Sequence, residues 1–148
     1  MPDKATDRAT ASPGDLLAWG RQALASQPFS RLVGAQLDAF APGLAELSLP
    51  VVPDLLQQHG FVHGGVLSYL ADNALTFAGG SVLGDSVTAE YKINYLRPAT
   101  KAERLLAVAA VVGSGKTQAV CRCDVFMLRD GERVLCAAAQ GTIRKATP

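Results

Sequence analysis

The chain has 148 residues, of which 49% are hydrophobic, and its formal net charge is +1. This length suits one domain with a sizeable core, and the hydrophobic content argues against an intrinsically disordered chain. The near-neutral charge, with no basic cluster, argues against nucleic acid as the main partner, and no apolar run approaches the ~20 residues that span a bilayer.

The N-terminal segment, residues 1–12, is polar and has no apolar stretch of the signal-peptide kind. We therefore expect a disordered leader in front of a single domain, residues 13–148, of a cytoplasmic protein. Three cysteines, Cys121, Cys123 and Cys136, form an odd count. In a reducing compartment this favours free buried thiols over a disulfide framework.

Residues 12–27 favour a first helix, in which Ser12 caps the start and Pro13 occupies the first turn. Pro28 is expected to end this helix. Residues 32–51 then favour two short strands around a turn at Pro42 and Gly43.

A long apolar helix is predicted to begin at the glycine pair Gly64 and Gly65 and to stop near Gly79 and Gly80. The hydrophobic period then changes to that of strands. Four strands are predicted as a meander in residues 86–96, 104–112, 117–128 and 133–145. A helix that is apolar nearly all round must be wrapped, and an antiparallel sheet curled around it is the simplest solution. The predicted class is α+β.

One stripe of this helix is small and polar, at steps of three and four residues. Its members are Gly65, Ser68, Asp72, Thr76 and Gly79. Two interpretations of Asp72 stand side by side. In the first it is a surface or structural acid, satisfied by a neighbour such as Lys92. In the second it is a general base, since an acid inside the apolar stretch YLADNALTFA is placed for chemistry.

The start of the helix supplies a second chemical feature. Its first amides have no acceptor within the helix and favour partial negative charge, such as that on a polarised carbonyl oxygen. Gly64 and Gly65 leave room for a ligand to reach these amides, and Gln57 offers a side-chain donor to the same oxygen. An oxyanion-type site is predicted here.

These two features are too far apart to act together within one chain. Residues 64 and 72 are separated by roughly 12 Å along a helix, whereas a general base must reach the attacked atom directly or through one water. Two helices packed antiparallel about a two-fold axis bring the start of one helix to Asp72 of the other. The sequence therefore predicts a homodimer with composite sites.

The stretch QQHGFVHGGVLSYLADNA (residues 57–74) resembles the signature of the PaaI-type hotdog-fold acyl-CoA thioesterases. YKINYLRPA and GKT follow in the order and spacing of that family, and the resemblance covers about residues 30–145. It implies a hotdog fold, in which an antiparallel sheet wraps one long central helix, here with an extra N-terminal helix. It further implies dimers or dimers of dimers, and hydrolysis of acyl-CoA without metal or cofactor.

Carried over by position, the resemblance gives each site residue a role. The Gly64 amide and the Gln57 side chain hold the thioester oxygen, and Asp72 of the partner subunit acts as general base on water or as nucleophile. His63 orients the region. Thr88 positions the water or is a purely structural strand residue; alternation places it on the polar face of its strand, opposite Val87.

Binding roles follow for other residues. Gly65 and Ser68 let the substrate approach closely, while Arg97, Pro98, Gly115 and Lys116 line a path for CoA or are ordinary exposed turn residues. The stretch GSGKT is not a Walker A loop, because the position that requires glycine is Ala110. His59 and His63 have no third ligand, so no metal is expected.

Two alternative functions remain open. The first is a hotdog protein that binds acyl-CoA without hydrolysis, which fits an Asp72 locked in an ion pair. The second is a hotdog hydratase or dehydratase that acts on an enoyl or hydroxyacyl thioester. The acyl group is left open between aryl-acyl and medium-chain groups.

Overall fold

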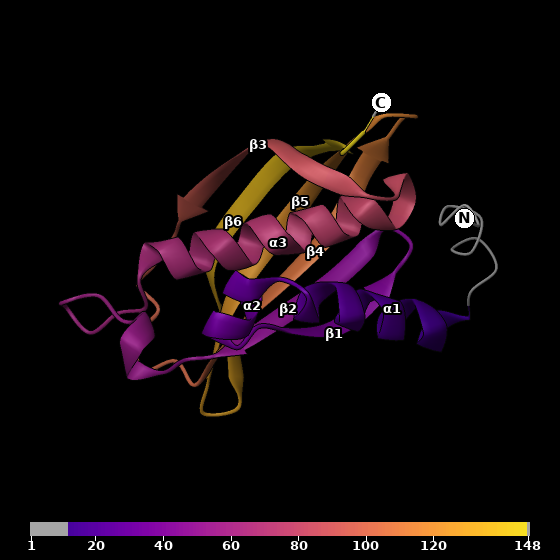
Figure 1. Cartoon of the computed structure of the whole chain (residues 1–148). Helices are drawn as coiled ribbons and strands as arrows, with labels where there is room; N and C mark the ends of the chain where they lie inside the picture. The colour runs from indigo at the N-terminus through magenta and orange to yellow at the C-terminus, as the bar shows by residue number, and fades with distance from the viewer. Residues whose placement is uncertain (1–11, 148) are drawn as a thin grey trace.

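The computed structural model describes residues 12–147, so the expected leader, apart from its last residue, Ser12, lies outside the described residues. Three α-helices, one 3₁₀ turn and six strands follow one another along the chain (Figure 1). They are α1 (Pro13–Ala25), α2 (Pro28–Val33), β1 (Gln36–Ala41), β2 (Leu44–Pro50), η1 (Pro53–Leu55), α3 (Gly64–Leu83), β3 (Ser86–Tyr95), β4 (Arg104–Ser114), β5 (Gln118–Arg129) and β6 (Glu132–Lys145).

The six strands form one antiparallel sheet in the order β1-β2-β4-β5-β6-β3. Helix α3 lies across this sheet, with α1 and α2 beside it (Figure 1). The α+β class and the predicted wrapping of one long helix are confirmed. None of the helices within residues 12–147 is both long and apolar enough to cross a membrane.

Helix α3 forms the centre of the hydrophobic core. Its buried side chains meet those of β2, β4, β5 and β6, and Leu70, Ala71, Ala74 and Leu75 are fully enclosed. Burying a leucine in this way contributes about 1.5–3 kcal/mol. The predicted core thiols Cys121 and Cys123 are buried in the same cluster and are free, as is Cys136.

The start of the chain follows the prediction in part. Ser12 caps α1 by accepting from the amide of Asp15 at 3.3 Å, and Pro13 occupies the first turn. Pro28, however, opens a second short helix, α2, because proline is also favoured at a first helical position. Gly34, with φ of 76°, ends α2, so β1 begins only at Gln36.

The predicted end of α3 was wrong. The helix continues through Gly79 and Gly80 to Leu83 and ends at Gly84. A Cβ on Gly79 would lie 2.7 Å from the side chain of Ile143. This glycine therefore serves a close helix–sheet contact rather than a helix stop.

The predicted meander was also wrong in one place. Strands β4, β5 and β6 are sequential neighbours, but β3 pairs with β6 at the far edge of the sheet. The connection over residues 96–103 is long enough to allow β3 and β4 to lie apart. As a result β3 lies beside the polar stripe of α3.

Strand β3 is held against β6 at Gly141, which opposes Tyr91. A Cβ on Gly141 would lie 2.5 Å from both the Glu90 carbonyl oxygen and the Tyr91 Cβ. We expect Gly141→Ala to destabilise the protein by about 1–3 kcal/mol through overpacking. Thermal unfolding measures this as a fall in Tm of about 2–4 °C per kcal/mol.

The matched control is Gly113→Ala on β4, where an added Cβ meets nothing within 4 Å. If Gly141→Ala and Gly113→Ala had the same Tm, β3 would be able to move away from the added Cβ without loss of stability.

Candidate active site

Asp72 lies in the middle of α3, half-buried, and points toward β3. The Thr88 hydroxyl donates to Asp72 Oδ1 at 2.6 Å, and Thr88 also shares a 2.8 Å hydrogen bond with Thr76. Within residues 12–147 the other carboxylate oxygen, Oδ2, has no hydrogen-bond partner, yet it is not sealed from solvent. Asp72 therefore has one anchored oxygen and one open oxygen.

The polar stripe of α3 faces β3 at Ser68, Asp72 and Thr76. The Ser68 hydroxyl bonds to that of Tyr91, and Gly79 packs on β6. Asp72 makes its bond to Thr88 rather than an ion pair with Lys92, which is exposed on β3. The stripe therefore forms a contact between α3 and β3, and the Asp72 carboxylate lies at the centre of this contact.

The predicted orientation of Thr88 was wrong. Alternation placed it on the polar face, but Thr88 faces α3 together with Tyr91, while Val87 is 40% exposed. A register shift at Ala89 reverses the phase of β3 between Thr88 and Glu90. Such a bulge inserts one residue and re-aims its neighbours.

His63 caps the start of α3. Its Nδ1 accepts from the Gly65 amide at 2.9 Å, and its carbonyl accepts from Val66. The orienting role of His63 in the site stays a prediction. Because the Gly65 amide already has a partner, the amide of Gly64 is the first one left open to a ligand.

A pocket of about 340 Å³ lies at this end of α3. Among its lining residues are Gln57, Gly64, Tyr95, Arg97 and Pro98. Gln57 Oε1 accepts from the His59 amide, which leaves the side-chain amide nitrogen as a donor. The structure therefore brings four predicted site residues, Gln57, Gly64, Arg97 and Pro98, to one pocket that excludes Asp72.

Tyr95 was not predicted as a site residue. Its hydroxyl donates to the Gly64 carbonyl at 3.0 Å, and its ring lies 3.3 Å from where a Gly64 Cβ would stand. In the sequence, Tyr95 is marked only as the last alternating residue of a predicted strand. That position does not indicate that the residue lines a pocket.

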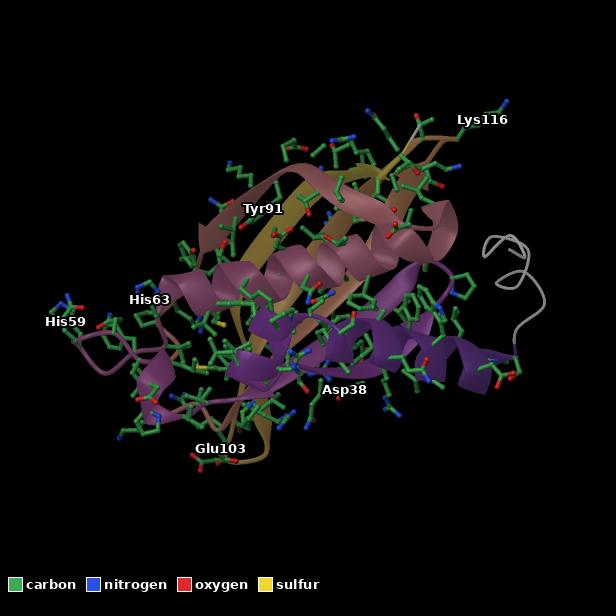
Figure 2. The ribbon with its side chains drawn as sticks, viewed as in Figure 1. Asp38, His59, His63, Tyr91, Glu103 and Lys116 are labelled. Carbon is green, nitrogen blue, oxygen red and sulfur yellow. The ribbon has the colours of Figure 1, made fainter. Side chains whose placement is uncertain are left out.

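The predicted CoA-binding residues divide into two groups. Arg97 and Pro98 line the pocket at the start of α3, whereas Lys116, in the turn between β4 and β5, lies at the opposite end of the molecule from His63 (Figure 2). Gly115 belongs to the same distant turn, where its amide donates to the Gln118 carbonyl. One chain does not bring all four residues together.

A family model described as "Thioesterase superfamily" matches residues 59–136, which include α3 and the pocket-lining residues 95–99. The chain belongs to the thioesterase superfamily. Its resemblance to the PaaI type is confirmed by sequence: it is 31% identical over 91 residues to the acyl-coenzyme A thioesterase PaaI of Escherichia coli, covering 62% of this chain and 65% of that protein.

Solved structures agree with this membership. A thioesterase family protein from Silicibacter pomeroyi superposes with a TM-score of 0.80 at 36% identity, covering 84% of this chain and 93% of that one. The phenylacetic acid degradation protein PaaI from Thermus thermophilus superposes with a TM-score of 0.72 at 32% identity, covering 80% and 99%. The protein is a hotdog-fold thioester hydrolase of the PaaI type.

Proposed function

We propose that the protein is an acyl-CoA thioesterase whose two half-sites come from two copies of the chain. The observation that carries this is the separation of the half-sites. Gln57 and Gly64 share a pocket at the start of α3, and Asp72 lies roughly 12 Å further along the same helix.

Strand β3 supports pairing of two copies. It is an edge strand of the sheet, and Val87 and Tyr95 on it are 40% and 54% exposed. An exposed edge is a template for a second strand, and an isologous contact closes after two copies. Antiparallel β3 strands across the contact would set the two α3 helices antiparallel, with the start of each near Asp72 of the partner subunit. A dimer of dimers is compatible with this pairing.

In this dimer the thioester carbonyl oxygen accepts from the Gly64 amide and the Gln57 side-chain amide. Asp72 of the partner subunit takes a proton from water through its open oxygen Oδ2, while Thr88 holds Oδ1. The hydroxide adds to the carbonyl carbon, the C–S bond breaks, and CoA leaves as a thiol after regaining a proton. Donors aimed at the developing oxyanion supply much of the rate enhancement in such reactions.

CoA phosphates meet Arg97 and Pro98 at the mouth of the pocket, with Gly115 and Lys116 of the partner subunit completing the path. A non-hydrolytic acyl-CoA-binding role is less well supported, because Asp72 pairs with a neutral hydroxyl instead of a cation. A dehydratase is less well supported too, because His63 Nδ1 is engaged as a helix cap.

A thiol-release assay over an acyl-CoA panel tests the proposal. The protein's own thiols do not compete for the reagent, because burial raises the pKa of Cys121 to about 11, that of Cys123 to about 12 and that of Cys136 to about 11. We expect one free thiol for each acid formed. Binding of acyl-CoA without thiol release would contradict the proposal.

A further inference from the structure

Strand β3 is an edge strand, and within residues 12–147 its outer edge pairs with no other strand (Figure 1). On its inner edge, the N–H of Leu96 donates to the Cys136 carbonyl at 2.9 Å. Hydrogen bonding alternates along an antiparallel pair, so the N–H and C=O groups of Tyr91, Ile93 and Tyr95 point away from β6. These three residues therefore offer donors and acceptors to a further strand.

The side chains of β3 divide between the two faces of the sheet. Tyr91 faces the core, where its hydroxyl bonds to that of Ser68 on α3. Glu90 and Lys92 lie exposed on the other face, and Glu90 Oε1 accepts from Thr142 of β6 at 2.6 Å. Within the described part of the chain, Glu90 Oε2 and the Lys92 ammonium group have no partner. One charge of each sign is thus available beside the open edge.

The order of these charges distinguishes the ways in which two copies of β3 can pair. In an antiparallel pair about a two-fold axis, residues opposite each other share a face, so each register has one residue opposite itself. With Tyr91 on the axis, Glu90 lies opposite Lys92 of the partner subunit, twice per dimer. With the axis at residue 90 or 92, like charges meet; at Ile93, Lys92 meets the neutral Asn94 of the partner subunit. Opposite charges across strands stabilise a sheet and like charges destabilise it, so Tyr91 is favoured.

The positions of the half-sites agree with this register. Thr88, whose hydroxyl bonds to Asp72, lies three residues before Tyr91. Tyr95, whose hydroxyl bonds to the Gly64 carbonyl, lies four residues after it. An axis at Tyr91 therefore brings the Gly64 end of one copy beside the Asp72 region of the partner subunit. An axis at residue 92 does so too but opposes the two lysines, and an axis at residue 90 or 93 slides the copies apart by a further roughly 7 Å or more.

We infer that the two copies pair with Tyr91 on the two-fold axis, and that two reciprocal ion pairs between Glu90 and Lys92 hold this register. The inference rests on the proposed two-copy hydrolase and adds the residues that align one copy with the other. Glu90 and Lys92 form a non-hydrogen-bonded pair across the contact, the kind in which side chains lie closest. They lie on the face of the sheet away from Asp72, so they are positioning residues that do not touch the substrate.

Cysteines at the two charged positions report the register directly. In a non-hydrogen-bonded pair the Cα atoms lie about 4.5 Å apart, within disulfide range, whereas diagonal residues lie about 7–8 Å apart, beyond it. Chains with Glu90→Cys and Lys92→Cys are co-expressed with different tags and oxidised. We expect a disulfide-linked dimer that carries both tags, and no link from either variant alone. The three cysteines of the unaltered chain are buried and do not compete.

The other outcomes contradict the inference. A link within Lys92→Cys alone would place residue 92 on the axis, and a link within Glu90→Cys alone would place residue 90 there. Either result, or no link in the mixture, would overturn the register. Maleimide labelling of the reduced proteins shows that both new thiols are reactive, so that a missing link reports geometry. The readout needs no catalysis: a mixed link together with no thiol release by the unaltered protein would overturn the hydrolase proposal alone.

Exchange of the charges tests the ion pairs themselves. Lys92→Glu opposes two glutamates twice per dimer, so we expect the dimer Kd at low salt to rise about 10-fold in sedimentation. The double variant Glu90→Lys with Lys92→Glu restores both pairs with their signs exchanged, and its Kd should return to within about 2-fold of the unaltered value. The control is Arg122→Glu, the same change in charge at an exposed position of β5.

Two results of this exchange would overturn the role of the ion pairs. One is an unchanged Kd in Lys92→Glu. The other is a double variant that dimerises no better than Lys92→Glu, with a Tm that shows each chain to be folded.

Discussion

Asp72→Asn is expected to lower kcat by at least ~10²-fold, because an asparagine cannot take a proton from water. The substitution keeps the oxygen that accepts from Thr88, so the contact between α3 and β3 is retained. Melting temperature and oligomeric state should therefore match those of the unaltered protein. The thiol-release assay with the best thioester of the panel measures the loss.

A matched control for this variant is Asp38→Asn, which removes the same charge from an exposed position on β1. We expect its turnover to stay within about 2-fold of the unaltered protein, as is usual for surface substitutions away from the site. Near-full turnover in Asp72→Asn would show that Asp72 takes no part in catalysis.

Gly64→Pro is expected to lower kcat by ~10²–10³-fold, because it deletes the amide proposed to bind the thioester oxygen. Proline is tolerated at the first position of a helix, where the N–H has no intrahelical acceptor. His63 has φ of −58° and ψ of 133°, a conformation that a following proline accepts. The variant should therefore fold with the cap in place.

The matched control is Gly64→Ala. It places a Cβ in the same position, 3.3 Å from the Tyr95 ring, but keeps the N–H. Because both variants carry the added Cβ, the ratio of their kcat values measures the effect of the missing N–H alone. Equal losses in Gly64→Pro and Gly64→Ala would mean that crowding at Tyr95, and not the missing donor, limits turnover.

The local features of the site follow directly from the sequence. The glycine pair after His63 marks the start of a helix, and a period of 3.6 residues puts Ser68, Asp72 and Thr76 on one stripe. Both signals are short-range, and the structure places these residues as the period requires. Gln57 and Gly64, which were predicted to form the oxyanion-type site, likewise line one pocket.

Features that depend on the sheet do not follow from the sequence. The bulge at Ala89 has no residue signature of its own, so strict alternation assigned Thr88 to the wrong face. The position of β3 beside β6 depends on a long connection that permits either edge. Gly79 resembles a helix stop, because the close approach of Ile143 is a contact between residues far apart in the chain.

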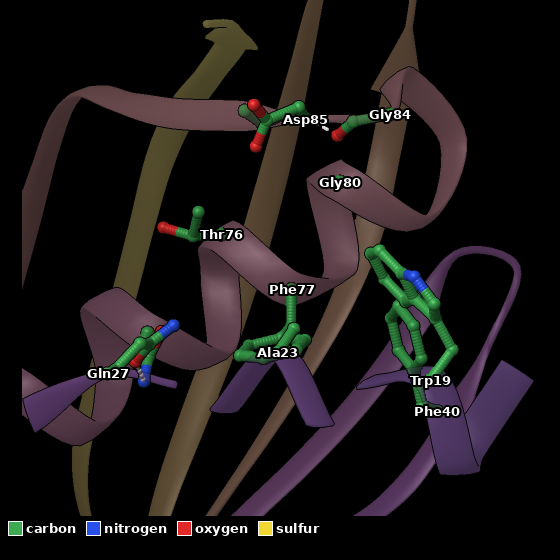
Figure 3. A pocket seen from close by; sticks show the side chains of 11 residues that line it. Trp19, Ala23, Gln27, Phe40, Thr76, Phe77, Gly80, Gly84 and Asp85 are labelled. Carbon is green, nitrogen blue, oxygen red and sulfur yellow. Dashed lines mark hydrogen bonds between the residues drawn. The ribbon is translucent and has the colours of Figure 1, made fainter. Parts of the chain in front are cut away.

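The pocket of about 120 Å³ between α1 and the later turns of α3 depends on tertiary structure as well (Figure 3). Trp19 and Gln27 lie on and just after the first helix, whereas Asn73 and Phe77 lie on the third. The period of each helix indicates which residues share a face, but not which helix packs against it. Helix packing therefore decides which residues line this pocket.

Mixed dimers test the central claim of a site shared between two copies most directly. One copy carries Asp72→Asn and the other Gly64→Pro, each with its own affinity tag, and the heterodimer is isolated by both tags in turn. It contains one site with both substitutions and one site with neither. We predict about half of the unaltered kcat per dimer, against ~1% or less for either homodimer. A heterodimer as inactive as the homodimers would show that Gly64 and Asp72 act within one chain, and would contradict the account.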